Sequence, residues 1–179
     1  ENYLIFATSG HLQELKKSGM YNLGVNLENF KPTYEIIPGK ENLITSRKQY
    51  LKREKISTIY LATDPDREGE AIAQEVVLLL ELKSEQYRRL LFYEITPHNI
   101  NEALNKPSEV NENLVEAQVS RQVLDRMIGF CLSSILQKTN QLTYSEIEKI
   151  VSAAQSILRE ALKLGGTSAF DFINPLAQK

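Results

Sequence analysis

The acidic residues Asp64, Asp66, Glu68 and Glu70 stand within seven consecutive positions of the 179-residue chain. Neighbouring carboxylates repel one another, so this cluster destabilises a fold unless a positive charge offsets it. Asp64 and Asp66 are two positions apart, and in an extended segment both side chains project to the same side. Carboxylate oxygens suit Mg²⁺, which keeps several of its waters and bridges to phosphate groups. The spacing therefore predicts a magnesium site formed by Asp64, Asp66 and Glu68.

A simpler interpretation is that these carboxylates only mark the start of a helix. Asp64 would then cap a turn, and residues 66–70 would favour the positive N-terminal end of the helix that follows. A helix start gains from one or two carboxylates, whereas this turn carries four of them directly after an apolar segment. The density of charge favours metal-dependent chemistry over capping alone.

The segments on either side must position this turn. Residues 57–63 are β-branched and apolar without clean alternation, which is typical of a strand buried on both faces of a parallel sheet. Residues 70–82 have apolar side chains at helical spacing and predict a helix that packs on that sheet. We expect further strands at residues 3–7, 34–37 and 90–95, and further helices at 41–55, from Thr96-Pro97 onward and at 113–130.

This alternation of strands and helices predicts an α/β fold with a mostly parallel sheet flanked by helices. Ligands of such folds bind outside the carboxyl ends of the strands. Further along the chain, Thr143 and Glu146 match a capping box and predict the start of another helix.

Two basic segments are candidates for contacts with phosphate. The helix at 41–55 exposes Arg47, Lys48 and neighbouring basic residues, and a solvated face is the favoured interpretation of these charges. The helix at 113–130 places Arg121, Asp125 and Arg126 among its polar positions. Arg121 and Asp125 are four positions apart, so a helical ion pair worth only about 0.2–0.5 kcal/mol is the alternative to a binding role.

Composition excludes several classes of protein. Hydrophobic residues make up 42% and charged residues 25%, which excludes long disorder and collagen-like or coiled-coil structure. The longest apolar run, residues 76–80, is far shorter than the roughly 20 residues of a membrane-spanning helix, so no membrane partner is expected. A single cysteine, Cys131, permits no internal disulfide and no cysteine-built zinc site. These features predict a cytoplasmic protein.

Charge is unevenly distributed although its total is only −2. Residues 61–120 carry 5 basic and 12 acidic side chains, whereas residues 1–60 and 121–179 carry a small basic excess. A protein that binds DNA needs at least a local basic surface. The composition by itself neither supports nor excludes a nucleic acid partner.

The segment Asp64-Pro65-Asp66-Arg67-Glu68-Gly69-Glu70 resembles the acidic signature of the Toprim domain, in the form found in type IA DNA topoisomerases. Four other segments resemble motifs of that family in the same order, namely residues 9–12, 34–40, 92–96 and 115–130. The resemblance extends from residue 2 to about residue 138. An Asp-x-Asp motif alone would also suit primases, recombination mediators and nucleases, but the Asp-Arg-Glu-Gly-Glu continuation favours topoisomerases.

The resemblance implies that Asp64, Asp66 and Glu68 bind Mg²⁺. The family relaxes negatively supercoiled DNA by cutting one strand through a tyrosine, passing a strand and resealing, and the metal would neutralise the phosphodiester during rejoining. Arg121 would contact a phosphate of the single-stranded segment, and Asp125 and Arg126 are further candidates for DNA binding. The implied partners are DNA and the remaining topoisomerase domains.

Three departures from the family pattern limit this expectation. The family's first strand, with its glutamate, has no counterpart before Glu1. The resemblance ends near Lys138, before the segments that supply the nucleophilic tyrosine. Gln122 stands where a second arginine is usual. We therefore expect a Toprim domain at 1–138, a helical extension at 139–179, and no DNA cleavage by the isolated chain.

The tail offers a weaker resemblance. Residues 156–174 are similar to the segment before the zinc finger of formamidopyrimidine-type DNA glycosylases, but the catalytic proline and the zinc-binding cysteines of those enzymes have no counterpart here. Two alternative functions remain open from the residues alone. One is a non-catalytic DNA- or protein-binding module on a Toprim scaffold, and the other is a Toprim nuclease or primase.

Overall fold

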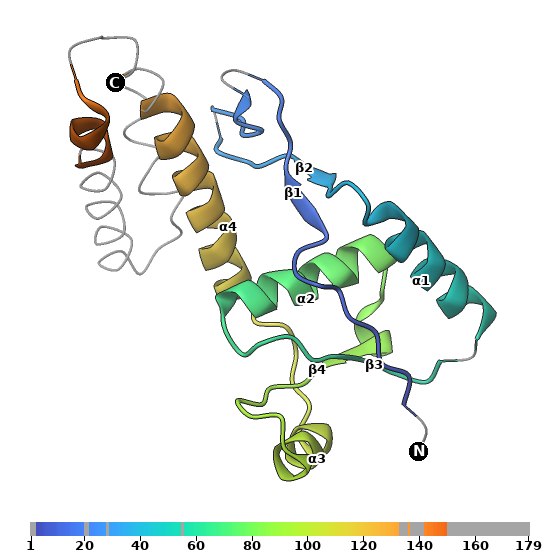
Figure 1. The fold of residues 1–179 in the computed structure, drawn as a ribbon. Coiled ribbons are helices and arrows are strands. Elements are labelled where there is room, and N and C mark those ends of the chain that lie inside the picture. Colours follow the sequence, from blue (N-terminus) through green and yellow to red (C-terminus); the bar gives the residue numbers. More distant parts are fainter. Residues whose placement is uncertain are drawn as a thin grey trace. The chain divides into compact units, whose positions relative to one another are not determined.

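The computed structural model describes residues 3–19, 22–27, 29–54, 56–132, 136 and 142–149. Its main elements, in chain order, are β1 (Gln13–Leu15), β2 (Tyr34–Ile36), α1 (Glu41–Arg53), β3 (Ile59–Leu61), α2 (Arg67–Leu80), β4 (Tyr87–Arg89), α3 (Pro97–Asn105) and α4 (Glu112–Met127) (Figure 1). The chain divides into two compact units. The first comprises Glu1–Glu14 and Glu35–Val115, and the second comprises Leu15–Tyr34 and Glu116–Lys179.

The first unit contains a parallel strand pair crossed by a helix. β3 and β4 are parallel, with Ile59 opposite Tyr87 and Leu61 opposite Arg89. Parallel strands require a crossover connection, and here α2 supplies it, as Figure 1 shows. The predicted α/β fold with helices beside a parallel sheet is therefore confirmed. β1 and β2 form another two-stranded sheet.

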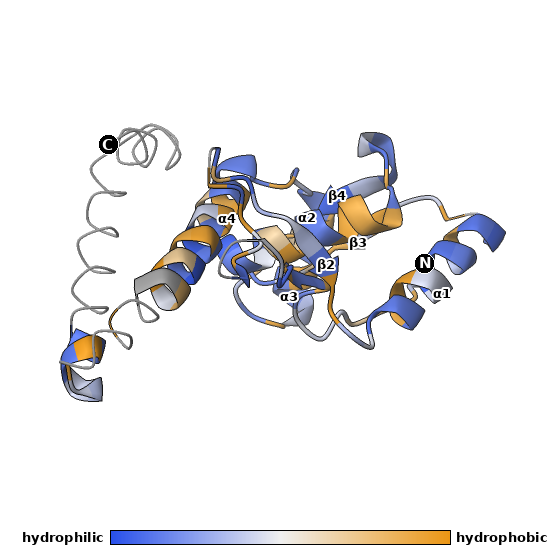
Figure 2. Cartoon of the chain, turned by 90° about the horizontal axis from the view of Figure 1, so that it is seen from above, coloured by the Kyte–Doolittle hydropathy of each residue, from blue (hydrophilic) through white to orange (hydrophobic). Residues whose placement is uncertain are grey.

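Apolar side chains of α2 and β3 form the core behind the acidic turn. Leu61 of β3 packs with Ala73 and Val77 of α2, and all three are buried. Figure 2 shows the hydrophobic residues of α2 in orange, whereas α1, which contacts α2, is mostly hydrophilic. Because three-residue strands bury little surface by themselves, the helix packing holds β3 in place and fixes where the turn begins.

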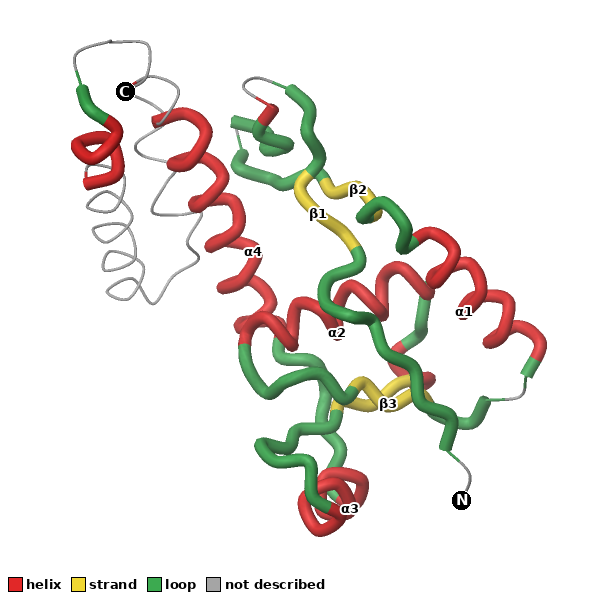
Figure 3. Tube along the Cα trace, in the orientation of Figure 1, coloured by secondary structure: helices red, strands yellow, loops and turns green. Residues whose placement is uncertain are grey.

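The strand expected at residues 90–95 is wrong. β4 ends at Arg89, and Leu90 donates its backbone N–H to the Leu61 carbonyl at 2.9 Å. β3 leaves the sheet after Leu61, so residues beyond Leu90 have no ladder partner on that side. Residues 91–95 therefore form a loop, drawn in green in Figure 3, and Tyr93 and Ile95 are each 87% exposed.

The strand expected at residues 3–7 is also wrong, because no strand of the described residues pairs with it. The segment runs as a loop with exposed Tyr3, Leu4, Ile5 and Phe6. The expectation that β3 is buried on both faces holds only in part, since Tyr60 is 37% exposed.

The starts of α1 and α3 agree with the sequence, whereas α2 begins at Arg67 rather than at the expected Glu70. α1 and α3 begin at Glu41 and Pro97, and the Thr96 side chain accepts a hydrogen bond from Asn99 N at 3.2 Å, as expected of an N-cap. In the second unit, α4 continues as a π-helical segment over Ile128–Leu132. The capping box is confirmed, because Thr143 N donates to Glu146 Oε2 at 2.8 Å and Glu146 N to Thr143 Oγ1 at 3.4 Å.

Most of the predicted extension lies outside the described residues, including the segment 156–174 that resembles glycosylases. Within the described ranges, no helix combines the length and apolar character needed to cross a membrane.

Candidate functional site

The acidic turn is shaped by hydrogen bonds among its own residues. Asp66 is the N-cap of α2, and its Oδ1 accepts a hydrogen bond from Gly69 N at 2.7 Å. Thr63 Oγ1 donates to the Gly69 carbonyl at 2.6 Å. An aspartate cap of this kind contributes about 1 kcal/mol to helix stability. The capping interpretation therefore holds for Asp66, which leaves its second oxygen, Oδ2, outside the cap.

Gly69 lets the first turn of α2 approach the backbone of Asp64. A Cβ atom at this position would collide with the Asp64 carbonyl oxygen. Only glycine fits such a close approach of two backbone segments. Asp64 is thus held directly against the start of α2.

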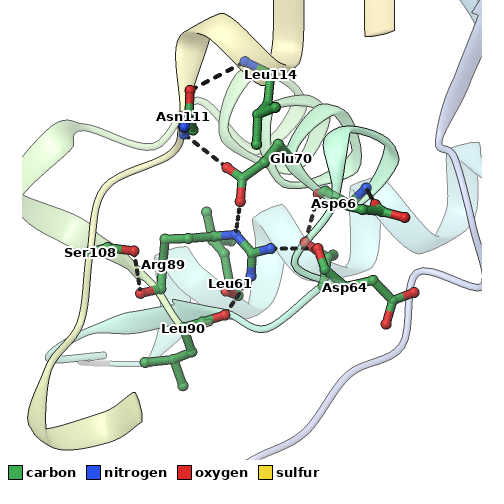
Figure 4. Close-up of polar contacts among 11 residues, drawn as sticks. Leu61, Asp64, Asp66, Glu70, Arg89, Leu90, Ser108, Asn111 and Leu114 are labelled. Carbon is green, nitrogen blue, oxygen red and sulfur yellow. Dashed lines mark hydrogen bonds and ion pairs between the residues drawn. The ribbon is translucent and has the colours of Figure 1, made fainter. Parts of the chain in front are cut away.

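A buried ion pair lies behind the turn. Arg89 and Glu70 are 0% and 2% exposed, and Arg89 Nε donates to Glu70 Oε1 at 2.8 Å. Arg89 Nη2 also donates to the Asp64 carbonyl at 2.7 Å, as Figure 4 shows. Glu70 Oε2 accepts a hydrogen bond from Asn111 N at 2.8 Å. The positive charge needed beside the acidic cluster is therefore Arg89, and Glu70 belongs to the interior of the unit.

The three carboxylates predicted to bind a metal are all exposed residues of this turn. In Figure 4 the carboxylates of Asp64 and Asp66 point out of the turn, on the side away from Arg89. Among the residues that the structure describes, no group of three or more histidine, cysteine, aspartate or glutamate side chains lies close enough together to hold a metal ion. The structure thus places Asp64, Asp66 and Glu68 on one turn without gathering their oxygens around a point.

The chemistry of these donors still fits a hydrated divalent cation. Mg²⁺ is usually bound through one or two carboxylates while it keeps several waters, and a closed protein cage is not required. The Asp64 carboxylate makes no hydrogen bond or ion pair with the other described residues, and Asp66 uses only Oδ1 in the cap. Exposed carboxylate oxygens that hydrated Mg²⁺ can reach are therefore present.

His11 and Glu75 adjoin the turn. From the sequence, His11 is as much a candidate for a turn or core histidine as for a site residue, and Glu75 is not predicted as a site residue at all. His11 Nδ1 donates to Glu75 Oε1 at 2.6 Å, and Glu75 Oε2 accepts from Leu12 N at 2.7 Å. On its other side, His11 Nε2 lies 3.7 Å from Glu68 Oε1. The available signal was a carboxylate whose helical neighbours at i−3 and i+4, Ile72 and Leu79, are apolar, and in the structure Glu75 is 5% exposed.

Hydrogen bonding dominates the charge state of His11. The bond to Glu75 raises the pKa of His11 above its ordinary value of 6.5, against the lowering effect of partial burial. The negative charges of Glu75 and Glu68 act in the same direction as the hydrogen bond. These contacts favour the charged form of a ring that lies 3.7 Å from Glu68, one of the three candidate ligands.

The candidate DNA-binding residues belong to the second unit. Arg121 Nε donates to Asp125 Oδ2 at 3.4 Å, so the helical ion pair considered from the sequence is present. Arg126 Nη2 donates to the Leu15 carbonyl at 3.3 Å, and its guanidinium lies 4.9 Å from the centre of the Phe130 ring. Gln122 Oε1 accepts a hydrogen bond from Tyr34 OH at 3.1 Å, which gives this departure from the family pattern a role in packing.

Comparisons with known proteins agree with the motifs of the turn. The family model described as the Toprim domain matches residues 1–95. The chain is 43% identical over 138 residues to DNA topoisomerase 1 of Aquifex aeolicus, a match that covers 77% of this chain and 25% of that protein. It is also similar to the structure of full-length topoisomerase I from Thermotoga maritima, with a TM-score of 0.62 and 38% identity over 73% of this chain and 22% of that one. The chain therefore spans about a quarter of the length of these relatives.

Proposed function

Because the chain belongs to the Toprim family, we propose that it is the metal-binding part of a type IA DNA topoisomerase. The observation that carries this proposal is the acidic turn, which follows β3 and presents Asp64, Asp66 and Glu68 at its surface. The whole enzyme would relax negatively supercoiled DNA by transient cleavage and rejoining of one strand. The nucleophilic tyrosine would come from another domain, since this chain spans only about a quarter of its relatives.

Asp64, Asp66 and Glu68 are the proposed ligands, and Mg²⁺ is the proposed ion. When bound, Mg²⁺ supplies positive charge that neutralises and positions a phosphodiester. The four carboxylates of the turn would contribute differently to this site. Asp64 and Glu68 offer exposed oxygens, Asp66 offers the oxygen that the helix cap leaves over, and Glu70 stays out of the ligand set because Arg89 holds it.

Arg121 is the proposed contact to a DNA phosphate, with Asp125 and Arg126 as neighbouring candidates. The Arg121 side chain is 43% exposed, and its pair with Asp125 is of the kind that contributes only about 0.2–0.5 kcal/mol. Phosphate accepts charge-assisted hydrogen bonds from arginine as carboxylate does, so a DNA phosphate can compete with Asp125 for the Arg121 guanidinium. We place this activity in the cytoplasm, as the cysteine content predicts.

The proposed boundaries are 1–138 for the Toprim part and 139–179 for the helical extension. The 138 residues aligned with the Aquifex aeolicus relative support a domain of this size.

The test is a calorimetric titration of Mg²⁺ and Mn²⁺ into the variant Asp64→Asn with Asp66→Asn. Asparagine is also a good N-cap, so the second substitution removes charge while keeping the start of α2. We expect metal affinity to fall by at least tenfold, by analogy with the 10–100-fold losses seen when groups that merely support metal ligands are removed. Circular dichroism checks that the fold is intact.

The matched control is Glu85→Gln with Glu102→Gln, which changes the net charge equally at exposed positions outside the turn. Its metal affinity should stay within about twofold of the wild type, since exposed charges at a distance are screened. Unchanged metal binding in the Asp64 and Asp66 variant would refute the proposed ligand set.

The same variants separate the alternative functions. Loss of DNA binding with an intact fold and no effect of metal would favour a non-catalytic binding module. Divalent-dependent nicking or primer synthesis by the chain alone would favour a Toprim nuclease or primase.

A further inference from the structure

We infer that Arg89 is a positioning residue for the acidic turn, whose backbone it holds so that Asp64 and Asp66 project from a fixed place. The inference deepens the proposed function and rests on it for the metal. It concerns a residue of β4, which no feature of the acidic motif singles out. Three observations carry it, namely the number of contacts, the burial and the double constraint on Asp64.

The Arg89 guanidinium joins four acceptors from different parts of the first unit. Nη1 donates to the carbonyls of Leu61 and Leu90 at 2.9 and 2.6 Å. Nη2 donates to the Asp64 carbonyl at 2.7 Å, and Nε donates to Glu70 Oε1 at 2.8 Å. The planar guanidinium of arginine has five N–H donors and can serve several separated acceptors at once. The donors of lysine all lie on one nitrogen, so lysine cannot reach the same set of acceptors. One side chain thus links the end of β3, the turn, the residue after β4 and α2 (Figure 4).

Burial shows that these bonds are not incidental surface contacts. Arg89 is 0% exposed, and a buried charge is costly unless it is paired and hydrogen-bonded. An apolar side chain would fill the same volume and would avoid the cost of burying charge. An apolar residue would, however, leave the Asp64 carbonyl without the hydrogen bond that Arg89 donates. We therefore infer that the role of the buried charge is to hold the turn.

The Asp64 backbone is constrained from two sides. On one side Gly69 lies so close that a Cβ atom would collide with the Asp64 carbonyl oxygen. On another, Arg89 Nη2 donates to that same oxygen. Glu70 completes the arrangement, because it orients Arg89 and accepts a hydrogen bond from Asn111 N at 2.8 Å. The buried fourth carboxylate therefore supports the exposed three without joining them.

The experiment compares Arg89→Lys with Arg88→Lys in the full chain. Both variants keep the charge, and Arg88 is the exposed neighbour of Arg89 on the same strand. The first readout is amide hydrogen exchange without metal. In Arg89→Lys the amides of Gly69 and Glu70, which hydrogen-bond to Asp66, should exchange at least tenfold faster, while those of α1 stay as in the wild type. Arg88→Lys should leave both regions unchanged.

The second readout is Mn²⁺ affinity, measured by electron paramagnetic resonance. Loss of a group that orients metal ligands typically weakens metal binding 10–100-fold, and we expect a loss in this range for Arg89→Lys only. Glu70→Gln provides a milder variant in case Arg89→Lys fails to fold. It keeps the shape of the pair but removes the negative charge, and it should give a smaller acceleration confined to the same turn.

The outcomes separate this inference from the proposed function. If the amides of Gly69 and Glu70 stay as protected as in the wild type while Mn²⁺ still binds, the role of Arg89 is refuted and the metal site stands. If exchange accelerates in the turn but the wild type binds no Mn²⁺, Arg89 holds the turn and the proposed metal function is refuted. Equal acceleration in the turn and in α1 means that Arg89 serves the fold in general, and it refutes the inference.

Discussion

The carboxylates around α2 divide by burial into two sets. Glu70 and Glu75 are 2% and 5% exposed and are bonded inside the first unit, whereas Asp66 and Glu68 lie at the exposed start of the helix. Residue type alone does not separate them, since all four are acidic. The difference comes from what the rest of the chain places opposite each one, Arg89 for Glu70 and His11 for Glu75.

His11 offers a direct test of its contact with Glu75. We predict that NMR titration finds the pKa of His11 above 6.5, because the hydrogen bond that His11 donates to Glu75 favours the charged ring. Glu75→Gln should lower this pKa more than Glu68→Gln, since Glu75 makes the hydrogen bond and Glu68 acts only through its charge. An equal response to the two substitutions would contradict the geometry.

The same shift predicts how stability depends on pH. The folded pKa of His11 is raised, so its contribution to the free energy of unfolding is fully present below the unfolded value of 6.5. That contribution is lost as the pH rises through the folded pKa. Urea denaturation of the wild type and of His11→Gln at several pH values should therefore show a difference in the free energy of unfolding that shrinks as the pH rises above the folded pKa of His11.

Glu70 should matter far more for stability than an exposed glutamate in an ion pair. Glu70→Ala leaves the guanidinium of Arg89 buried without its counter-charge, and we expect the free energy of unfolding to fall by about 3–5 kcal/mol. Glu102→Ala removes the exposed ion pair with Lys106, at 3.5 Å, and should change the free energy of unfolding by less than about 1 kcal/mol. Urea denaturation of both variants measures the contrast, and similar losses would argue against a buried pair.

At the level of elements, the helices were predicted well and the strands poorly. Helix starts are encoded locally, by Thr96 before α3 and by Asp66 before α2. A strand exists only where a partner offers its backbone, and that partner is distant in sequence. Residues 90–95 have the composition of a strand, but β3 leaves the sheet at Leu61 and the ladder ends at Leu90.

The site follows the same rule. The acidic turn was found from its own residues because its members are adjacent in the chain. Arg89 follows Glu70 by 19 positions and His11 precedes Glu75 by 64, and no local pattern connects such pairs.

Gly69 gives the sharpest prediction at this scale. Alanine is the better helix former by about 1 kcal/mol, so propensity alone favours Gly69→Ala. The added Cβ would meet the Asp64 backbone, and we expect a net loss of about 1–3 kcal/mol in unfolding free energy, as for overpacked sites. Gly129→Ala is the control, because nothing lies within 4 Å of a Cβ there. Thermal denaturation that ranks the two variants in the opposite order would contradict the close approach.

For the whole molecule, the main fact is that the chain spans about a quarter of its relatives. A reaction that needs a nucleophile from another domain requires that domain to be present. We predict that the purified chain does not relax a negatively supercoiled plasmid in the presence of Mg²⁺, while it still binds the ion. Full relaxation by the chain alone would place the nucleophile among its own tyrosines and would refute the proposed division of labour.

The cap at Asp66 has a consequence for the ion selectivity of the proposed metal site. With Oδ1 engaged by Gly69, Asp66 has one oxygen to give unless α2 loses its first hydrogen bond. Calcium often takes both oxygens of a carboxylate at once, whereas magnesium's octahedral shell accepts them singly. An ion that takes both oxygens of Asp66 would have to break this first hydrogen bond of α2, whereas an ion bound through one oxygen would leave it intact. We therefore expect the proposed site to bind magnesium in preference to calcium.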